Sequence, residues 1–398
     1  MQSLISVDEA THAVHAQPRV RANESVPLPE AVGRVLADEV MAERAHPPFD
    51  RVTMDGIATR WLPVMPAVLR VAGAQTPGGY GQALREADTC IEVASGALLP
   101  DGCDCVIPIE HLVRNAQGYS LAPAASPSRG QFIHRQGADC PGDAVVLEAG
   151  VRIGPPQMAV LAANGVATVN TVRLPTVAIV TTGDALLDVA APLHPARIRR
   201  CSDLAMMAAL QAAGLGLPTL QPLSDDPDVL GATLSRLLQS HDVLVLSGGV
   251  TLGQRDYLPT TLESVGVRCV FQGVAQQPGR AMWFGVGPNA QRVFALPGNP
   301  YSALVCMARY VRPALLSGMG VSVVACEQVR LAAAVPAHVL TQFVAVRLRR
   351  EPGGEMLAQP LPPRSNADVT TLAATDGFVE VPAGLACEVG HALPLYRW

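Results

Sequence analysis

The chain has 398 residues, of which 49% are hydrophobic and 16% charged, so it is long enough for two to four domains and cannot be a disordered polar chain. The formal net charge is -5 and the basic residues are dispersed, which disfavours nucleic acid as a partner because no broad positive field would attract a phosphate backbone. All 29 basic residues are arginine, which excludes Schiff-base and P-loop chemistry based on lysine.

The spacing of the cysteines and the length of the apolar runs indicate in which cellular compartment we expect the protein. Nine cysteines are scattered along the chain, and the spacing of Cys103 and Cys105 suits neither a zinc knuckle nor an ordinary disulfide. The N-terminal segment is acidic and polar, and no stretch approaches the ~18 uncharged apolar residues of a membrane span. We therefore expect a cytoplasmic protein with no membrane partner.

The N-terminal half predicts a helical region interrupted by a β-rich module. Ser6 and Glu9 have the spacing of a capping box, which predicts a short helix toward Ala16. From Val26 to about Arg135, short β-like runs alternate with Pro and Gly clusters, and helical spacing then returns. We expect a linking helical region formed by residues 1–26 and 137–173, with a β-rich insertion at 27–136.

After residue 173, strands and helices alternate, which predicts a mostly parallel sheet with helices on both faces in an α/β domain at 174–318. The expected strands contain VAIVTT, PTLQPL, DVLVLS, RCVFQG and RVFAL, and the expected helices cover 202–213, 228–240, 257–265 and 301–316. The last 80 residues, 319–398, lose this alternation and predict a small β-barrel or sandwich. The fold class is therefore multidomain α/β.

Three Gly-rich loops directly follow apolar strands of the α/β domain. They are Thr181–Asp184 (TTGD), Ser247–Asp256 (SGGVTLGQRD) and Leu296–Ser302 (LPGNPYS). Loops that follow parallel strands meet at one edge of the sheet, where open α/β folds bind ligands. Glycines at 248 and 249 allow a phosphate close to backbone N–H groups, Asn299 can cap the next helix, and Pro300 suits its first turn. These features favour an anion site, although any one loop is more simply a turn.

Carboxylates accompany these loops. Asp184, Asp225, Asp226 and Asp256 lie in or near them, and oxygen ligands beside a phosphate commonly hold Mg²⁺. The simpler interpretation, solvated carboxylates or helix caps, has equal weight for Asp225 and Asp226. In the N-terminal half, Asp55-Gly56 and Ser95-Gly96 by themselves indicate only turns.

Several strings along the whole chain resemble the MoeA family, the molybdopterin molybdenumtransferases, which also include the E domains of gephyrin and plant molybdenum insertases. In family order they are LPEAVGRVLA, PPFD with MDG, ASGALLPDGCDCVIPIE, Arg135 with Gly137 and Asp139, VAIVTTGD, SGGVTLGQRDY, QPGRAMWFG and LPGNPYSALV. The α/β part also occurs in molybdopterin adenylyltransferases and in the competence-damage protein, a nucleotide-cleaving relative. The strings at the two ends favour the transferase branch.

The resemblance implies an elongated homodimer with an adenylyltransferase-like α/β domain, a β-rich insertion, a linking helical region and a C-terminal β-barrel. The implied reaction inserts molybdate into adenylylated molybdopterin and releases AMP, with Mg²⁺ as cofactor. Its site would lie in the cleft between the α/β domain and the partner subunit's insertion. A molybdopterin adenylyltransferase or an apo-molybdoenzyme would be possible protein partners.

The resemblance also implies roles for individual residues. The catalytic residues would be Asp55, Asp139, Asp184 and Asp256, and the metal ligands Asp184, Asp225 and Asp256. The substrate-binding residues would be Ser95, Thr182, Gly183, Ser247, Gly248, Gly249, Thr251, Gly253, Arg280, Pro297, Gly298, Asn299, Pro300 and Ser302.

This chain departs from the family pattern at four places. The expected T-G-D-E has Ala185 in place of its Glu, and the expected K-P-G-K has Gln277 in place of its first Lys. The expected E-F-x-R has Ala345 in place of its Arg, and the expected Q-x-S has Asn366 in place of its Ser. Because an oxyanion is held by cations and charge-assisted hydrogen bonds, these changes predict a weakened molybdate pocket. Three hypotheses stay open: a working transferase, a paralogue that binds without turnover, and a nucleotide hydrolase or adenylyltransferase. Molybdate-dependent, absent or molybdate-independent AMP release separates them.

Overall fold

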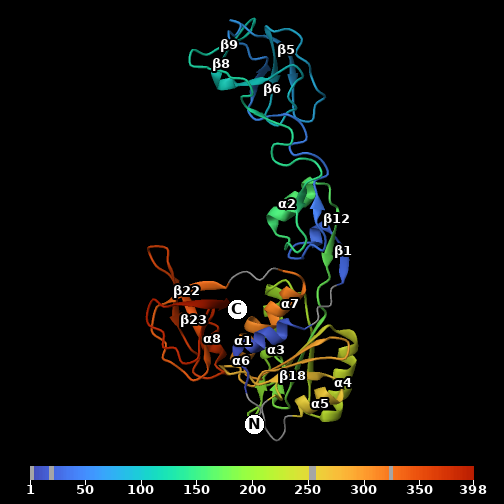
Figure 1. Ribbon diagram of the computed structural model, residues 1–398, viewed down its shortest axis with the longest axis vertical. Helices are drawn as coiled ribbons and strands as arrows, with labels where there is room; N and C mark the ends of the chain where they lie inside the picture. Colours follow the sequence, from blue (N-terminus) through green and yellow to red (C-terminus); the bar gives the residue numbers. More distant parts are fainter. Residues whose placement is uncertain (1–3, 18–21, 251–256, 322–325) are drawn as a thin grey trace.

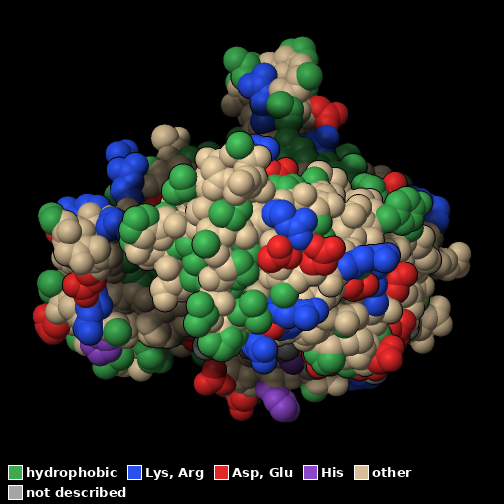
Figure 2. All heavy atoms as spheres, turned by 90° about the horizontal axis from the view of Figure 1, so that it is seen from above, with side chains coloured by type: hydrophobic (Ala, Val, Ile, Leu, Met, Phe, Trp, Pro, Cys, Tyr) green, Lys and Arg blue, Asp and Glu red, His purple; other side chains and the backbone are tan. Residues whose placement is uncertain are grey.

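The computed structural model describes residues 4–17, 22–250, 257–321 and 326–398. The chain is elongated, with the β-rich insertion at one end, a narrow linking region in the middle, and the α/β domain beside the C-terminal barrel at the other end (Figure 1). On the face shown in Figure 2, acidic and basic side chains are interspersed rather than gathered by sign. In the part of the chain that the structure describes, no helix has the length and apolarity needed to cross a membrane.

The insertion is built on a four-stranded sheet with the order β5-β6-β4-β7. Two smaller ladders, β8 with β9 and β3 with β10, complete it. The strands are β3 Arg51–Val52, β4 Gly56–Thr59, β5 Arg70–Gln75, β6 Thr89–Val93, β7 Cys105–Pro108, β8 Leu112–Asn115, β9 Gly118–Leu121 and β10 Ile133–His134.

The linking region consists of two short antiparallel ladders and one helix. β1 pairs with β12, and β2 pairs with β11. The elements are β1 Asn23–Pro27, β2 Val40–Met41, β11 Val145–Leu147, α2 Pro155–Ala163 and β12 Thr168–Val172.

Two of the predicted domain limits need correction. The predicted insertion covers 27–136, but β2 pairs with β11 and Leu36 forms a bridge with Thr171, so the start of this range, as far as β2, belongs with the linking region. Helix α1, Val7–His15, was assigned to the linking region, but Val7, Ala10 and Val14 are buried in the core of the α/β domain. Its apolar spacing gives one stripe, which the α/β domain covers (Figure 1). The other limits stay predictions.

The α/β domain contains the predicted, mostly parallel sheet, with the order β16-β13-β17-β21-β20-β18. Alternate residues of its central strands enter two cores, one shared with α1, α3, α6 and α7 and the other with α4 and α5. Helices therefore cover both faces, as predicted. The strands are β13 Val177–Thr182, β16 Thr219–Leu223, β17 Val243–Ser247, β18 Arg268–Gln272, β20 Trp283–Val286 and β21 Arg292–Leu296, and the helices are α3 Ser202–Ala212, α4 Pro227–Ser240, α5 Leu258–Ser264, α6 Pro300–Cys306 and α7 Arg312–Gly318.

Two details of this domain differ from the prediction. Strand β20 was missed, and it runs antiparallel to both of its neighbours. The single helix expected at 301–316 is instead divided into α6, a π-helical turn at Met307–Val311, and α7. Pro313 gives the physical reason, because it has no N–H and its ring clashes with the carbonyl four residues earlier in a regular α-helix.

The C-terminal domain is a closed five-stranded barrel. Its strands follow the order β23-β24-β22-β26-β25, and β25 pairs again with β23 to close the ring. Strand β19 from the α/β domain extends this sheet through its parallel pairing with β23. The elements are β19 Gln276–Gln277, β22 Glu327–Leu331, β23 Thr341–Arg350, β24 Met356–Pro360, α8 Val369–Leu372, β25 Gly377–Val381 and β26 Ala392–Arg397.

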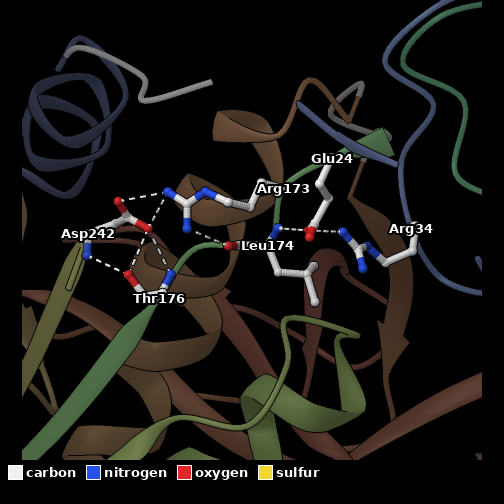
Figure 3. Close-up of polar contacts among 6 residues, drawn as sticks. All are labelled: Glu24, Arg34, Arg173, Leu174, Thr176 and Asp242. Atoms are coloured by element: carbon white, nitrogen blue, oxygen red, sulfur yellow. Dashed lines mark hydrogen bonds and ion pairs between the residues drawn. The ribbon is translucent and has the colours of Figure 1, made fainter. Parts of the chain in front are cut away.

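A polar junction fixes the linking region to the α/β domain at the start of β13 and β17 (Figure 3). Arg173 Nη2 donates to both carboxylate oxygens of Asp242, at 3.0 and 2.9 Å. The backbone N and the Oγ1 of Thr176 also donate to Asp242, each at 2.8 Å. Burial raises the pKa of Asp242, but the hydrogen bonds from Thr176 and Arg173 outweigh burial, so the pKa lies below its ordinary value. The junction therefore holds Asp242 as a carboxylate.

Candidate active site

The three Gly-rich loops meet at one edge of the α/β sheet, as predicted. β13, β17 and β21 are adjacent and parallel, so their carboxyl ends lie together. Gly248 N donates to the carbonyl oxygen of Leu296 at 3.2 Å, and Ser247 Oγ donates to that of Pro297 at 3.4 Å. An added Cβ at Gly298 would lie 3.4 Å from the Cα of Gly248. The structure thus brings together Thr182, Gly183, Ser247, Gly248, Gly249, Pro297 and Gly298.

Contacts between the loops already require glycine at position 248. Its φ is +102°, and an added Cβ would lie 2.8 Å from the carbonyl oxygen of Thr182. Gly249 has a φ of +63°, in the left-handed region. Packing of the loops is sufficient to explain both glycines, so their contact with a phosphate stays a prediction.

The start of α6 also lies at this edge. Asn299 occupies the N-cap position, but its side chain makes no capping hydrogen bond, contrary to the expectation that it caps the helix. Pro300 occupies the first turn, as predicted. Ser302 is only 2% exposed, which argues against a direct contact with substrate.

Two of the predicted acidic residues lie together at the same edge. Asp184 N donates to Asp225 Oδ2 at 3.3 Å, and Asp225 N donates to Asp184 Oδ1 at 3.4 Å. Asp226 instead caps α4, since its Oδ1 accepts from the backbone N of Asp228 and of Val229. Hydrogen bonds thus explain Asp226 as a cap and leave Asp184 and Asp225 as the candidates for Mg²⁺.

The third predicted metal ligand, Asp256, lies outside the described residues, as do the predicted substrate-binding residues Thr251 and Gly253. Among the residues that the structure does describe, no group of three or more His, Cys, Asp or Glu is placed to hold a metal ion. The Mg²⁺ site therefore stays a prediction.

A polar cavity of about 440 Å³ adjoins Asp184. Its walls include Thr181, Gly183, Asp188, Arg197 and Arg200. Arg197 and Arg200 are not among the residues that the sequence predicts for the site. The only available signal was the dense run RIRR at 197–200, and nothing in the sequence showed that the pairing of β14 Leu186–Leu187 with β15 Ile198–Arg199 returns this run to the edge.

Three positions predicted to depart from the family pattern, Gln277, Ala345 and Asn366, lie in β19 and in the C-terminal domain. Gln277 pairs with Gln342 where β19 meets β23. The backbone N of Ala345 donates to Tyr301 Oη at 3.0 Å, and Tyr301 N donates to the carbonyl oxygen of Asn366 at 3.2 Å. The barrel is therefore attached to the first turn of α6.

Two further predicted positions, the cation Arg280 and the departure Ala185, also lie near this edge. Arg280 is exposed in the segment between β18 and β20, whose ends lie at the carboxyl edge of the parallel strands. Ala185 lies between Asp184 and β14.

The insertion forms its own polar cluster. Asp55 Oδ1 accepts from the backbone N of Ser95 at 2.6 Å, so these two predicted residues are adjacent. Asp139 Oδ1 lies 2.9 Å from His134 Nε2, and His134 Nδ1 lies 3.2 Å from Arg51 Nη2. Because an arginine only donates, His134 Nδ1 accepts and Nε2 carries the proton toward Asp139.

The structure does not bring the two halves of the predicted site together within one chain. Asp55, Ser95 and Asp139 belong to the insertion, and Asp184, Asp225 and Gly248 belong to the α/β domain. The linking region separates these domains along the length of the molecule (Figure 1). A site that needs both halves must take one of them from another chain.

Comparison with known proteins covers nearly the whole chain. Family models match at residues 5–165, the MoeA N-terminal region (domain I and II), at 178–317, a probable molybdopterin binding domain, and at 328–398, the MoeA C-terminal region (domain IV). The chain is also 31% identical over 404 residues to a molybdopterin molybdenumtransferase of Synechocystis, covering 99% of this chain and 100% of that protein. The chain belongs to the MoeA family.

Two further relatives agree with this assignment. A molybdopterin molybdenumtransferase of Bacillus subtilis is 30% identical over 397 residues, covering 96% of this MoeA chain and 90% of the relative. A crystal structure of a molybdopterin biosynthesis MoeA protein from Pyrococcus horikoshii OT3 has a TM-score of 0.83 at 25% identity and covers 100% of both chains. The match includes the insertion, the linking region, the α/β domain and the barrel.

Proposed function

We propose that this protein inserts molybdate into adenylylated molybdopterin and releases AMP, as a step of molybdenum cofactor biosynthesis. The observation that carries the proposal is the meeting of three Gly-rich loops, from three adjacent parallel strands, beside Asp184 and Asp225. Backbone N–H groups at such an edge suit the phosphates of an adenylylated pterin. Membership of the MoeA family supports the choice of substrate.

The residues of the proposed site have two roles, phosphate binding and Mg²⁺ binding. Thr182, Gly183, Gly248 and Gly298 form the surface against which the phosphates would lie. Asp184 and Asp225 are neighbouring carboxylates whose oxygens suit Mg²⁺ and its retained waters. When bound there, Mg²⁺ would neutralise the charge that develops on the phosphates as AMP leaves.

We further propose that the working unit is a homodimer. In one chain the insertion, which carries Asp55, Ser95 and Asp139, lies at the other end of the molecule from the α/β domain, so the insertion of one subunit would complete the site at the α/β edge of its partner (Figure 1). The cytoplasm remains the proposed compartment, and all nine cysteines are free thiols in the structure. A molybdopterin adenylyltransferase that supplies the substrate and an apo-molybdoenzyme that receives the product are the proposed protein partners.

The test uses purified full-length protein, Mg²⁺ and adenylylated molybdopterin, with and without molybdate, and measures AMP by chromatography. Molybdate-dependent AMP release supports the transferase. Absence of release would assign the protein to binding without turnover, and equal release without molybdate would assign it to nucleotide hydrolysis. The first of these alternatives has a specific motive, since the motif comparison predicts that Gln277, Ala345 and Asn366 stand where the family has polar or charged residues.

A further inference from the structure

The insertion is joined to the linking region by two chain segments, residues 42–50 and 135–144, which together form a neck (Figure 1). The neck extends from the ladder of β2 with β11 to the ladder of β3 with β10. Backbone hydrogen bonds join its two segments, as where Ala42 N donates to the carbonyl oxygen of Ala144 at 2.7 Å. The orientation of the insertion therefore depends on how the neck is held.

A buried side chain of the linking region holds the neck from one side. Asn164 follows α2 and is only 7% exposed. Its Oδ1 accepts from the backbone N of Glu43 at 3.1 Å and lies 3.1 Å from Nε2 of His46, both of which belong to the neck. Because Oδ1 is an acceptor, His46 Nε2 carries a proton and donates it to this bond.

The end of α2 fixes the position of the Asn164 side chain. Its Nδ2 donates to the carbonyl oxygen of Val160 at 2.8 Å, one turn back along the helix. Gly165 comes next, with a φ of +71°, the left-handed conformation in which many helices end. An added Cβ at Gly165 would lie 3.2 Å from Glu43 Oε2, so the neck packs closely against this turn. Capping of α2 thus explains Nδ2 of Asn164 but not its Oδ1, which faces the neck.

His46 connects this contact to Asp139, for which the family resemblance implies a catalytic role. His46 N donates to the carbonyl oxygen of Cys140 at 2.8 Å. The carbonyl oxygen of His46 accepts from the backbone N of Asp139 at 2.9 Å and from that of Cys140 at 3.0 Å. The Asp139 carboxylate is then held by His134, with His134 Nε2 2.9 Å from Oδ1. A continuous set of hydrogen bonds therefore runs from the end of α2 to the segment that carries this acid.

We propose that Asn164 and His46 are positioning residues, which set the orientation of the insertion and so place Asp139 at the site of the partner subunit. The inference deepens the proposed function and rests on it, because an acid on the insertion serves the reaction only at the α/β edge of another chain. Neither positioning residue has a role in binding the pterin. Loss of their contact should therefore lower kcat and leave the KM for adenylylated molybdopterin unchanged.

The variants are made at His46, which is half-buried, because replacement of Asn164 would also remove the cap of α2. His46→Leu and His46→Gln both lose the ring, but only glutamine keeps an N–H that can reach Asn164 Oδ1. A difference between these two variants therefore reports the hydrogen bond and not the packing of the ring. His391 is exposed in the C-terminal domain, and His391→Leu is the matched control.

The first measurement needs no turnover. Hydrogen exchange of the full-length protein, read by mass spectrometry, should be faster in both neck segments of His46→Leu by ~10-fold, as expected for loss of one hydrogen bond. Small-angle X-ray scattering reads the orientation of the insertion, and the curve of His46→Leu should depart from that of the parent. His46→Gln and His391→Leu should match the parent in both measurements.

The second measurement is the rate of AMP release at varied concentrations of adenylylated molybdopterin. His46→Leu should lower kcat by ~10-fold or more, because misplacement of a reacting group by ~1 Å is costly, and its KM should stay within about twofold of the parent value. His46→Gln should restore most of kcat. A change in KM with kcat intact would contradict a positioning role.

The inference is overturned if His46→Leu matches the parent in exchange and scattering, or if His46→Gln is as impaired as His46→Leu. The two proposals fail separately. Faster exchange and altered scattering in His46→Leu, with no AMP release by the parent, would uphold the control of orientation and reject the proposed function. AMP release by the parent that His46→Leu retains in full would reject only this inference.

Discussion

Replacement of Asp242 by asparagine tests whether the junction in Figure 3 stabilises the α/β domain. Asp242 accepts four hydrogen bonds from Arg173 and Thr176, and asparagine would present an N–H₂ group to some of these donors. A hydrogen bond to a charged group contributes ~1.5 to 3 kcal/mol. Since the side chain is still 22% exposed, we expect Asp242→Asn to lower the free energy of unfolding by ~2 kcal/mol.

The matched control is Asp88→Asn in the insertion. Asp88 forms the same type of pair with Arg70, with Arg70 Nη2 and Nε at 3.0 and 3.1 Å from its oxygens, but both side chains are 53% exposed. Solvent and salt screen an exposed pair, so this variant should unfold like the parent. Calorimetry, which separates the transitions of different domains, should show a fall of ~5 °C for the α/β transition in Asp242→Asn only.

The stability that Asp242 contributes should depend on pH, and the direction of its pKa shift gives the sign of this dependence. The pKa of Asp242 is lowered in the folded state, so its contribution is present above the pKa of the unfolded chain and is lost as pH falls through the folded value. The difference between parent and Asp242→Asn should therefore be constant from pH ~8 to ~5 and shrink below pH ~4. Equal melting temperatures at pH 7, or a difference that persists undiminished at pH ~3, would refute this reasoning.

Three further predictions concern the site and its supports. Gly248→Ala should lower the melting temperature as well as substrate binding, because the new Cβ would overlap the carbonyl oxygen of Thr182; a variant as stable as the parent would contradict the loop geometry. Tyr301→Phe should destabilise the contact between α6 and the barrel by ~1 to 3 kcal/mol, since the backbone N of Ala345 loses its acceptor, and urea unfolding checks this value. Burial raises the pKa of the Cys306 thiol to about 12, so mass spectrometry after native alkylation at pH 8 should find Cys306 unmodified, and early labelling would place it nearer the surface.

The sequence predicted those parts of the fold that depend on regular alternation. The parallel arrangement of the central strands and the edge where Thr182, Gly248 and Gly298 meet follow from apolar strands that each end in a Gly-rich loop. The missed strand β20 is four residues long and lies between two Gly-containing turns, so its pattern is too short to distinguish from a loop. The division of the last helix depends on Pro313, whose effect on the helix was not anticipated.

The candidate site was only partly predictable because several of its members meet through tertiary packing. The proximity of Asp184 to Asp225 follows from the meeting of the loops at one edge, but Arg197 and Arg200 reach the polar cavity beside Asp184 through the short pairing of β14 with β15. Sequence spacing also does not show that the insertion, to which Asp55 belongs, lies at the other end of the molecule from the α/β domain (Figure 1).

The central claim is that a site is completed by two chains, and mixing two inactive variants tests it most directly. Asp55→Asn removes an acid from the insertion and Asp184→Asn one from the α/β domain, so each variant alone should release little AMP. In random mixed dimers, half of the dimers combine the two variants and each has one intact site, so about a quarter of the parent activity should return. Mixing Asp55→Asn with Ser95→Ala, both in the insertion, should restore none. Absence of recovery in mixed dimers whose formation is verified by mass spectrometry would show that each site is built within a single chain.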